Sequence, residues 1–499
     1  MPVRWYHILL VPSILTAQTN QPPSPAQTIT PGDVMRRVSI IAHDSMLGRD
    51  NPSRGLELTA QYVASEFRRA GLLPGGDNGG YLQRFELRRW SIDPGGSAVE
   101  LITLHTRQTL AVGSEARYVD GRVPNSPIRG NVVLLSGPLS AGKDLRNRIV
   151  LVVLDYSKPL PPSLGQDIYR LAGAGPAAVL LLSNRDSATF AQRLTTAAQS
   201  RLSRHTAAHE DSVAPILEVH QRTLGPLFAD LGIDPDEIRQ ASRTVRKAVA
   251  NVTTEVRLAV QVQSRAELPN VIGVLEGSDS ALRHEYVVYS AHIDHIGLTP
   301  GQPDSINNGA DDNASGVAGL LELAQAFSRP GARPRRSLLF LAPSAEEPGL
   351  LGSDHFTEHP TVPLKDIVAD INMDLIGRNW PDSVIAVGLE QSDLGATLRQ
   401  VVEAHPELRM TPIPDRWPEE RIFYRSDHYN FARKGVPILF FTSGTHSDYH
   451  RPSDEPGLIN GEKESRLVQL LFHLGRAVGD RTERPRWADE SYRQIVERK

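Results

Sequence analysis

The sequence predicts an α/β protein whose main sheet is largely parallel and is covered by helices on both faces. Three observations lead to this prediction. From residue 268 onward the chain contains short, β-branched and mostly apolar runs, as buried strands do. Amphipathic helical patterns alternate with these runs. Polar clusters follow several of the runs, and ligands of open α/β sheets bind beyond the carboxyl ends of the strands.

The N-terminal part of the fold is expected to begin near residue 30. A helix is predicted over residues 56–70, because apolar side chains recur at helical spacing on one face and Gly71 ends the pattern. Strands are expected at residues 81–87 and 99–104.

The segment 101–255 differs from the rest of the chain in its pattern of apolar residues. Apolar strand runs lie at residues 131–135, 149–154 and 177–182, and a helical pattern covers residues 168–174. It contains no recognisable catalytic cluster, and His205, His209 and His220 are interpreted as scattered surface histidines.

The remainder carries the α/β pattern. Strand runs lie at residues 270–275, 285–290, 337–342, 367–373 and 437–442. One helix is predicted directly after Ser315, since apolar residues share a face there, and another at residues 464–478.

Composition excludes several classes of protein. A chain of 499 residues suggests two to four domains at about 150 residues each. With 54 Lys and Arg against 58 Asp and Glu, the net charge of −4 lacks the basic field of a nucleic-acid binder. The absence of cysteine excludes disulfides, thiol catalysis and Cys-based metal sites, so any metal must be held by His, Asp and Glu.

The first residues are typical of a secretory signal. Arg4 precedes an apolar stretch at residues 5–15, and Ala17 offers a small residue for cleavage. We therefore expect a signal peptide at 1–17, a linker at 18–29 and export to the periplasm or medium; the alternative is a disordered N-terminal arm. No apolar run reaches the ~18 residues of a membrane span.

The first polar cluster follows the strand run at 285–290. Alternation in extended backbone would point His292 and Asp294 together and His295 the opposite way. Asp294 is placed to orient a metal-bound His292 ring. The alternative is a hydrogen-bonded surface pair.

Two acidic pairs follow. Asp311 and Asp312 precede the helix after Ser315; either is a helix cap, or one carboxylate bridges two metals. Glu346 and Glu347 come shortly after a buried strand, where two carboxylates repel each other unless a cation is nearby. One of them would bind metal while the other meets a water; the alternative is a solvated loop pair.

The last clusters are near the carboxyl ends of the final strands. Asp374 ends a mostly apolar strand, and Tyr449 stands beside His450, where a phenol could donate to an oxyanion. Together the clusters supply two His and three carboxylates as ligands, with one Glu to spare as a base. Such N/O donors suit Zn²⁺ or Mn²⁺, with Co²⁺ possible.

The ordered motifs resemble those of the secreted di-zinc aminopeptidases, the family of aminopeptidase S and aminopeptidase Y, with glutamate carboxypeptidase and glutaminyl cyclase more distant. The motifs are HIDH, GADDNASG, SAEEPGLLGS, NMDLIGR, YRSDH and YHRPSD. The resemblance implies a three-layer α/β/α zinc-exopeptidase domain with a mixed sheet, in two parts at 30–100 and 256–487, and a tail at 488–499. GKDLRNRIVLVVLD and LAGAGPAAVLLLSN make segment 101–255 look like an inserted, β-rich protease-associated domain.

The same resemblance implies a role for each matching residue. His292 and Asp374 would complete one zinc site and Glu347 and His450 the other, with Asp312 as the bridge. Glu346 matches the general base, and Asp294 the carboxylate behind His292. Tyr449 and Arg425 match groups that contact the tetrahedral intermediate or the substrate. His295, His428 and His446 are interpreted as structural or rim residues.

The resemblance implies a peptidase that removes residues from the N-termini of peptides or proteins, using two Zn²⁺ per chain. Three alternatives stay open: a carboxypeptidase or dipeptidase of the same fold, a glutaminyl-cyclase-like transferase with one zinc, and a binding protein without catalysis.

Overall fold

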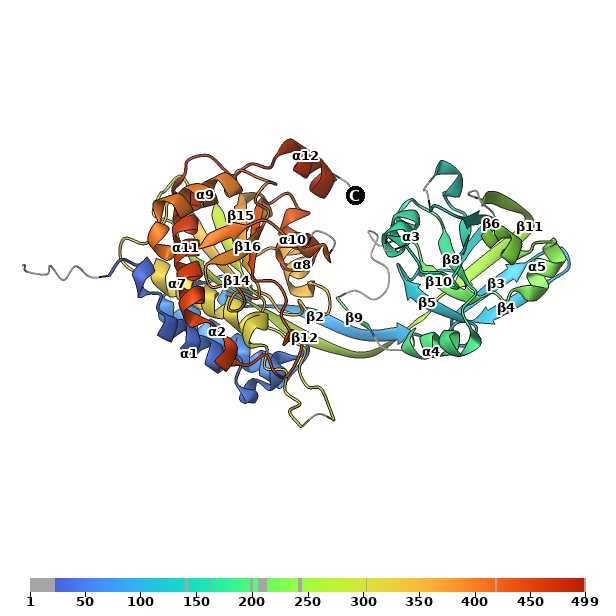
Figure 1. Ribbon diagram of the computed structural model, residues 1–499, viewed down its shortest axis with the longest axis horizontal. Helices are drawn as coiled ribbons and strands as arrows, with labels where there is room; N and C mark the ends of the chain where they lie inside the picture. The colour runs from blue at the N-terminus through green and yellow to red at the C-terminus, as the bar shows by residue number, and fades with distance from the viewer. Residues whose placement is uncertain are drawn as a thin grey trace, which may run out of the picture.

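Two β-sheets organise the chain in the computed structural model (Figure 1), which describes residues 23–139, 142–161, 163–197, 201–204, 213–240, 245–301, 303–417 and 420–497. The expected signal peptide, the start of the linker, and His205 and His209 lie outside these residues. The larger sheet has ten strands and the smaller one eight.

The larger sheet contains the strands predicted after residue 268, with further strands at both edges. Its order is β17 (Thr411–Ile413), β16 (Ser383–Val387), β18 (Ile438–Thr442), β15 (Ile367–Met373), β13 (Tyr286–Ser290), β14 (Ser337–Ala342), β12 (Val260–Leu275), β2 (Leu82–Ile92) and β9 (Arg201–Ser203), with β1 (Leu73–Pro74) also paired to β12.

This sheet is mixed, and the expected parallel arrangement holds only at its centre. Strands β18, β15, β13 and β14 run parallel, whereas β12, β2 and β9 pair antiparallel with their neighbours. The antiparallel β2–β12 ladder arises because the chain leaves the sheet along β2, builds the second sheet, and returns along β12. Hydrophobic patterning does not reveal strand direction, so the sequence could not distinguish these edges.

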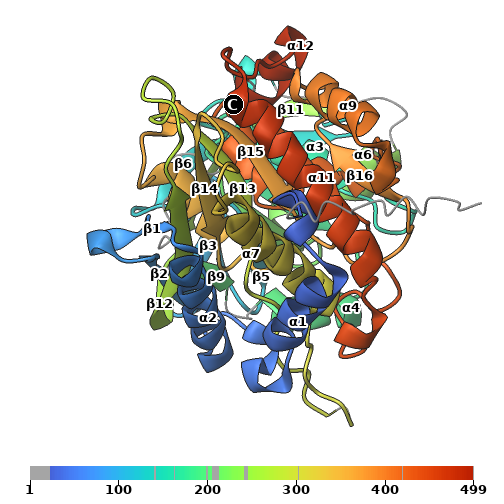
Figure 2. The same cartoon turned by 90° about the vertical axis from the view of Figure 1, so that its left-hand side faces the viewer.

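Helices cover both faces of the larger sheet. Figure 2 shows α1 (Pro31–Ile41), α2 (Arg54–Ala70), α7 (Gly316–Phe327), α9 (Leu394–Ala404) and α11 (Gly461–Asp480) over one face. Helices α8 (Leu351–Glu358) and α10 (His428–Ala432) pack on the other. Side chains alternate accordingly along β13: Val287 and Tyr289 join the first core and Val288 the second. The architecture is therefore three layers.

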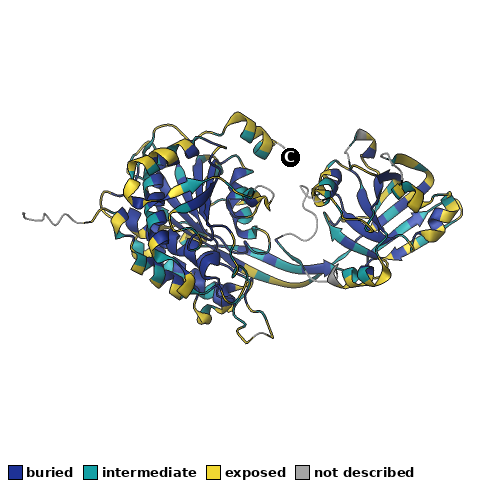
Figure 3. Cartoon of the chain, in the orientation of Figure 1, coloured by how far each residue is buried: buried dark blue, intermediate teal, exposed yellow. Residues whose placement is uncertain are grey.

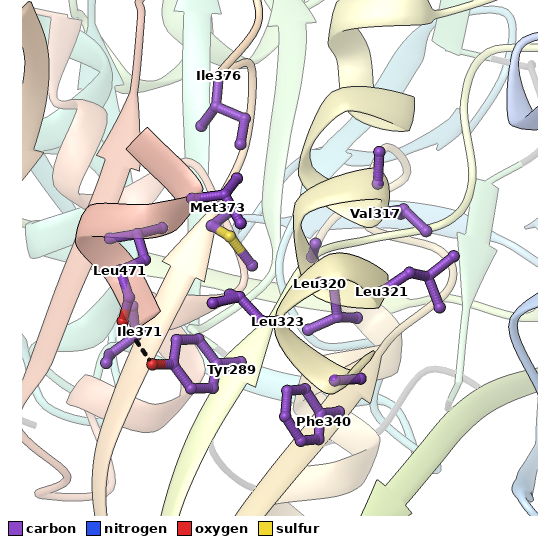
Figure 4. Close-up of a cluster of buried hydrophobic side chains, with 14 of the residues drawn as sticks. Tyr289, Val317, Leu320, Leu321, Leu323, Phe340, Ile371, Met373, Ile376 and Leu471 are labelled. Atoms are coloured by element: carbon purple, nitrogen blue, oxygen red, sulfur yellow. Dashed lines mark hydrogen bonds between the residues drawn. The ribbon is translucent and has the colours of Figure 1, made fainter. Parts of the chain in front are cut away.

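Helix ends and core contacts explain why the first layer is well defined. The Ser53 side chain accepts from the Leu56 amide at the start of α2, and Gly71 ends that helix with φ of 80°. In the core between α7 and the sheet (Figure 4), the Tyr289 hydroxyl donates to the Leu471 carbonyl of α11 at 2.7 Å. This bond satisfies the one polar atom of a fully buried ring.

The second sheet spans residues 98–257. Its order is β4 (Arg107–Ala111), β3 (Ala98–Ile102), β11 (Val245–Arg257), β6 (Ile128–Ser136), β7 (Ile149–Val153), β8 (Ala178–Ser183), β10 (Ile216–His220) and β5 (Ala116–Asp120). Strands β6, β7, β8 and β10 are parallel, and apolar clusters lie on both faces of them. The central strands of both sheets are buried, whereas β4, β11 and the first half of β12 are largely exposed (Figure 3).

Helices α3 (Leu164–Gly173), α4 (Ser187–Ala197), α5 (Gly225–Leu231) and α6 (Pro235–Gln240) accompany the second sheet. Strand β9 comes from this part of the chain but pairs with β2 in the larger sheet. Directly after it, Arg204 forms ion pairs with Asp354 and Glu358 of α8. The two parts are thus joined by the long β2 and β12 strands and by this returning segment (Figure 1).

Short helical turns complete the fold. They are η1 (Ala26–Thr28), η2 (Asp44–Arg49), η3 (Asp77–Gly79), η4 (Lys143–Leu145), η5 (Ala310–Ser315), η6 (Leu364–Asp366), η7 (Pro406–Leu408), η9 (Ile422–Tyr424), η10 (Pro456–Leu458), α12 (Asp489–Tyr492) and η11 (Arg493–Glu497). Among the described residues, no helix has both the length and the apolar character needed to cross a membrane.

Candidate metal centre

The polar clusters meet beyond the carboxyl ends of the four parallel strands. His292 follows β13, Glu346 and Glu347 follow β14, Asp374 follows β15, and His450 lies in the loop after β18. Parallel strands present their carboxyl ends at one edge of a sheet, so residues far apart in sequence converge there. Asp312 reaches the same place from η5, just before α7.

The first group contains His292, Asp374 and Glu346. The Nε2 atom of His292 lies 3.3 Å from Asp374 Oδ1 and 4.0 Å from Glu346 Oε2. These three side chains each offer one atom within 4.8 Å of the others, which is close enough to surround a single cation. The His292 ring is 1% exposed.

The second group contains His450, Glu347, Asp312 and His295. The Nε2 atom of His450 is 3.1 Å from both Glu347 Oε2 and Asp312 Oδ2. On the other side, Nδ1 of His295 is 2.8 Å from Glu347 Oε1. Donor atoms of all four lie within 4.8 Å of one another.

Asp312 stands between the two groups. Its Oδ1 is 3.5 Å from His292 Nε2, whereas its Oδ2 is the atom near His450. One carboxylate therefore turns one oxygen to each group, as a bridging ligand would.

The expectation that His295 points away from the site is wrong, and of the two interpretations given above, structural or rim, its burial contradicts the rim. The His295 ring is completely buried and contacts Glu347. Strand β13 ends at Ser290, so residues 291–295 are not part of the pleated ladder whose alternation the expectation assumed.

Asp294 lies behind the site but makes different contacts from those expected. Its carboxylate is 3.7 Å from His292 Nδ1, beyond hydrogen-bond range, and that nitrogen lies 3.3 Å from the Asp294 carbonyl instead. The carboxylate accepts from the backbone amides of Glu346 at 3.1 Å and Glu347 at 3.2 Å. Asp294 thus holds the loop that carries both glutamates.

Two supporting residues had no sequence signal. The Asn51 side chain donates to Asp294 at 2.6 Å and accepts from the Ala345 amide at 3.1 Å. The buried Arg49 guanidinium donates to carbonyls of loops on both sides of the site, including Ile293 and Asn308. Both residues lie outside any chemically recognisable motif, in a segment that reaches the site only through the fold.

A third support holds the bridging carboxylate. The carboxylate of Asp454, which closes the YHRPSD motif, accepts from the backbone amides of Asp311 and Asp312. Asp311 itself accepts from the Gly377 amide at 2.6 Å and lies 3.3 Å from His446 Nε2. Asp311 and His446 are therefore structural, as is His428, which donates its Nε2–H to the Phe423 carbonyl and stacks on Phe440.

The buried charges of the site perturb one another strongly. Burial raises the pKa of Glu346 well above its ordinary value, and nearby Asp374 and Glu347 raise it further against the opposing effect of His292. Burial would lower the pKa of His450, but hydrogen bonds to Asp312 and Glu347 overcome it and raise the value to about 10. Burial also opposes ionisation of Glu347, yet hydrogen bonds from His295 and His450 bring its pKa well below the ordinary value.

The donor set fits divalent cations. His292 Nε2 and Asp374 Oδ1 are buried atoms that make no well-formed hydrogen bond within the described residues, although they lie 3.3 Å from each other. Buried polar atoms are normally satisfied, and imidazole nitrogens with carboxylate oxygens are the ligands of Zn²⁺ and related ions.

A cavity of about 360 Å³ opens on the two groups. Asp312, Glu346, Glu347, Asp374 and His450 form its polar side, together with Tyr449 and Arg425. The opposite walls are mostly apolar and include Leu350, Leu375, Trp417, Ile422 and Phe440. Arg425 lines the cavity, is half-exposed and lies 3.6 Å from Glu420.

Comparison with known proteins agrees with this chemistry. Residues 270–474 match the model of peptidase family M28. Aminopeptidase YwaD of Bacillus subtilis (strain 168) is 30% identical over 226 residues, which cover 44% of this chain and 41% of that protein. Aminopeptidase NAALADL1 of Mus musculus is 39% identical over 124 residues, which cover 23% of this chain and 15% of that protein. The matches thus span less than half of either relative.

Two solved structures are similar along most of the chain. An aminopeptidase from Aneurinibacillus sp. strain AM-1 covers 92% of this chain and 98% of its own, at 18% identity and a TM-score of 0.49. BSAP, a zinc aminopeptidase from Bacillus subtilis, covers 94% and 98%, at 16% identity and a TM-score of 0.48.

The residues of both donor groups lie between His292 and His450, inside the matched segment. Residues 270–474, which carry the candidate metal centre, are therefore similar to peptidase family M28.

Proposed function

We propose that this chain is a metal-dependent aminopeptidase that hydrolyses N-terminal peptide bonds with two zinc ions. The observation that carries the proposal is the pair of donor groups that share Asp312 and face one cavity together with Glu346. The two relatives reported above are aminopeptidases, which supports the same activity here.

In this proposal each side chain keeps one role. His292 and Asp374 would hold one zinc ion, Glu347 and His450 would hold the other, and Asp312 would be shared by both. When bound, the two ions polarise the scissile carbonyl and make a water molecule nucleophilic at neutral pH. Mn²⁺ or Co²⁺ would serve as substitutes.

Glu346 is the proposed general base. It faces the cavity beside His292, and its raised pKa matches a group that must both take and return a proton. Its carboxylate accepts a proton from the attacking water and later delivers that proton to the leaving amine. The surrounding carboxylates also suit the free amino group of a substrate N-terminus.

Tyr449 and Arg425 complete the proposed site. Burial and the nearby carboxylates raise the pKa of Tyr449 well above its ordinary value, so its phenol stays protonated and can donate to the developing oxyanion. Arg425, which lines the same cavity, is placed to contact the substrate chain.

The rest of the chain is assigned by the same resemblance. Segment 101–255 is proposed to be an inserted protease-associated domain, 30–100 and 256–487 the two parts of the catalytic domain, and 488–499 a tail. Export through residues 1–17 is proposed from the sequence pattern. It would place the enzyme in the periplasm or the medium, together with the peptides found there.

The function is tested by a chelator-reversible screen of aminoacyl amides, short peptides and their N-blocked counterparts. We expect cleavage only of substrates with a free amino group, loss of activity with chelator, and recovery with Zn²⁺. Release of C-terminal residues from N-blocked peptides would instead identify a carboxypeptidase, and conversion of a glutamine-led peptide without hydrolysis would identify a cyclase.

The role of Glu346 is tested by Glu346→Gln. We expect two metals per chain by elemental analysis, as in the wild type, and kcat lower by about 10²–10⁴-fold. Near-normal turnover of the metal-loaded variant would contradict the assignment.

The ligand assignment is tested by His450→Ala, which is expected to bind about one metal per chain. A variant that still holds two would show that His450 is not a ligand.

A further inference from the structure

We propose that His295 is a positioning residue of the second metal group. His295 donates its Nδ1–H to Oε1 of Glu347 and so leaves Oε2 as the oxygen that faces His450. The proposal rests on the proposed function, because it assumes that Glu347 is a ligand. It adds a sixth side chain to the five ligands and assigns it a distinct task.

The contacts of Glu347 are divided between its two oxygens. Oε1 lies 2.8 Å from His295 Nδ1, and Oε2 lies 3.1 Å from His450 Nε2. The backbone amide of Glu347 is held separately by Asp294 at 3.2 Å. With the main chain fixed, the His295 bond is the shorter of the two side-chain contacts that set the rotation of the carboxylate, and the other comes from a proposed ligand.

The His295 ring is itself held in one place. It is completely buried, and it meets the His450 ring edge-on with 5.5 Å between centroids. Gly309, at φ of 57°, makes room for it, because a Cβ at that position would lie 2.6 Å from His295 Cδ2. A ring packed against backbone in this way presents Nδ1 in a fixed direction.

The Nδ1 atom of His295 lies farther from the Asp312 carboxylate than from Glu347. His295 Nδ1 is 3.6 Å from Asp312 Oδ2, against 2.8 Å from Glu347 Oε1. The shorter distance is that of a charge-assisted hydrogen bond. It therefore favours His295 as a hydrogen-bond donor to the Glu347 carboxylate rather than as a fourth ligand of the metal ion. Carboxylates that bind metals are commonly oriented by such hydrogen bonds, and removal of the orienting group typically weakens metal binding by 10–100-fold.

Two variants separate the hydrogen bond from the packing of the ring. His295→Asn places an amide N–H close to the position of Nδ1, whereas His295→Phe keeps a ring and removes the donor. His473→Phe changes a histidine of α11 outside the site and serves as the matched control. Thermal unfolding of each metal-free protein checks that the fold is retained.

The measurement is the dissociation constant of each bound Zn²⁺, obtained by competition with a chromogenic chelator. We expect two tight ions in the wild type and in His473→Phe. In His295→Phe one of the two should bind 10–100-fold more weakly, and His295→Asn should stay within about threefold of the wild type.

Visible spectra of the Co²⁺-loaded proteins provide a second readout. We expect the absorption of His295→Asn to match that of the wild type, because no ligand is lost. Unchanged affinities in His295→Phe would overturn the proposal. An altered Co²⁺ spectrum with weakened binding in His295→Asn would also overturn it, since His295 would then be a ligand.

Failure of the proposed function gives a different result. If the wild type bound no Zn²⁺ at the site, the ligand assignment itself would fall. If the wild type bound two ions and both His295 variants did so equally well, only the role of His295 would fall.

Discussion

Asp294 shows how one side chain can place several others. Fully buried, it accepts from the Asn51 side chain and from the amides of Glu346 and Glu347. These bonds hold a loop in which Ala345 takes a positive φ of 56°, a conformation that a non-glycine residue keeps only when its neighbours enforce it.

We therefore predict that Asp294→Asn disturbs both glutamates. Asparagine replaces one accepting oxygen with a donor that faces other donors, at a cost of about 1–3 kcal/mol. Urea unfolding of the metal-free protein should show this loss, and the affinity for Zn²⁺ should fall. Asp382→Asn, at a side chain that is 63% exposed, is the matched control and should change neither quantity. Equal stability of the two variants would contradict this role of Asp294.

The pKa of His450 leads to a second prediction at this scale. A value of about 10 means that the metal-free protein holds a proton on His450 at pH 7, and a ligand nitrogen must lose it. Binding of Zn²⁺ at pH 7 should therefore release at least one proton per chain, and apparent affinity should weaken as pH falls from 8 to 6. Calorimetry in two buffers of different ionisation enthalpy measures the release; identical heats would contradict it.

At the scale of elements, the sequence predicted most of the described strands after residue 268 but missed β16 and β17, and of the helices it predicted α7 and α11 but missed α8, α9 and α10. β15 and β14 have the expected bounds, and α7 follows Ser315 as expected. Short apolar runs and helical periodicity are local, so they can be read without the fold. The first half of β12, residues 260–269, was missed because its alternating polar residues pair only with β2, which lies far away in sequence.

The packing of α11 on β13 gives a prediction at this scale. At Gly475 of α11 a Cβ would lie 1.8 Å from the Tyr289 hydroxyl oxygen and 3.2 Å from Phe327 Cζ. Gly475→Ala should destabilise the protein by about 1–3 kcal/mol through overpacking, despite the higher helix propensity of alanine. Gly457→Ala, where the added methyl meets nothing within 4 Å, is the control and should be nearly neutral. Denaturant midpoints of the two variants decide between these outcomes.

At the scale of the whole molecule, the two sheets are linked by more than the β2 and β12 strands. Arg204 is 4% exposed at its side chain and reaches Asp354 and Glu358 of α8, the helix that follows Glu346 and Glu347. This contact holds β9 against the larger sheet, although β9 lies between strands of the second sheet in the sequence.

Removal of this contact should loosen β9. In Arg204→Ala we expect the backbone amides of Arg201–Ser203 to exchange roughly tenfold faster, equivalent to about 1.4 kcal/mol of lost local stability. Arg265→Ala removes a pair with Glu86 that is 59% exposed on the arginine side and should leave this exchange unchanged. Mass spectrometry of deuterium uptake measures both; equal uptake would show that Arg204 does not hold the strand.

The sequence by itself determined the kinds of donor, their order along the chain and the strands that carry them. These follow from composition and from local periodicity: without cysteine, the ligands had to be His, Asp and Glu. The tertiary structure decided which atoms meet: the two oxygens of Asp312, the burial of His295, and the supports from Asn51 and Arg49. Loops beyond the strand ends have no repeating geometry, so the direction of their side chains is set by contacts with distant segments, which no local pattern records.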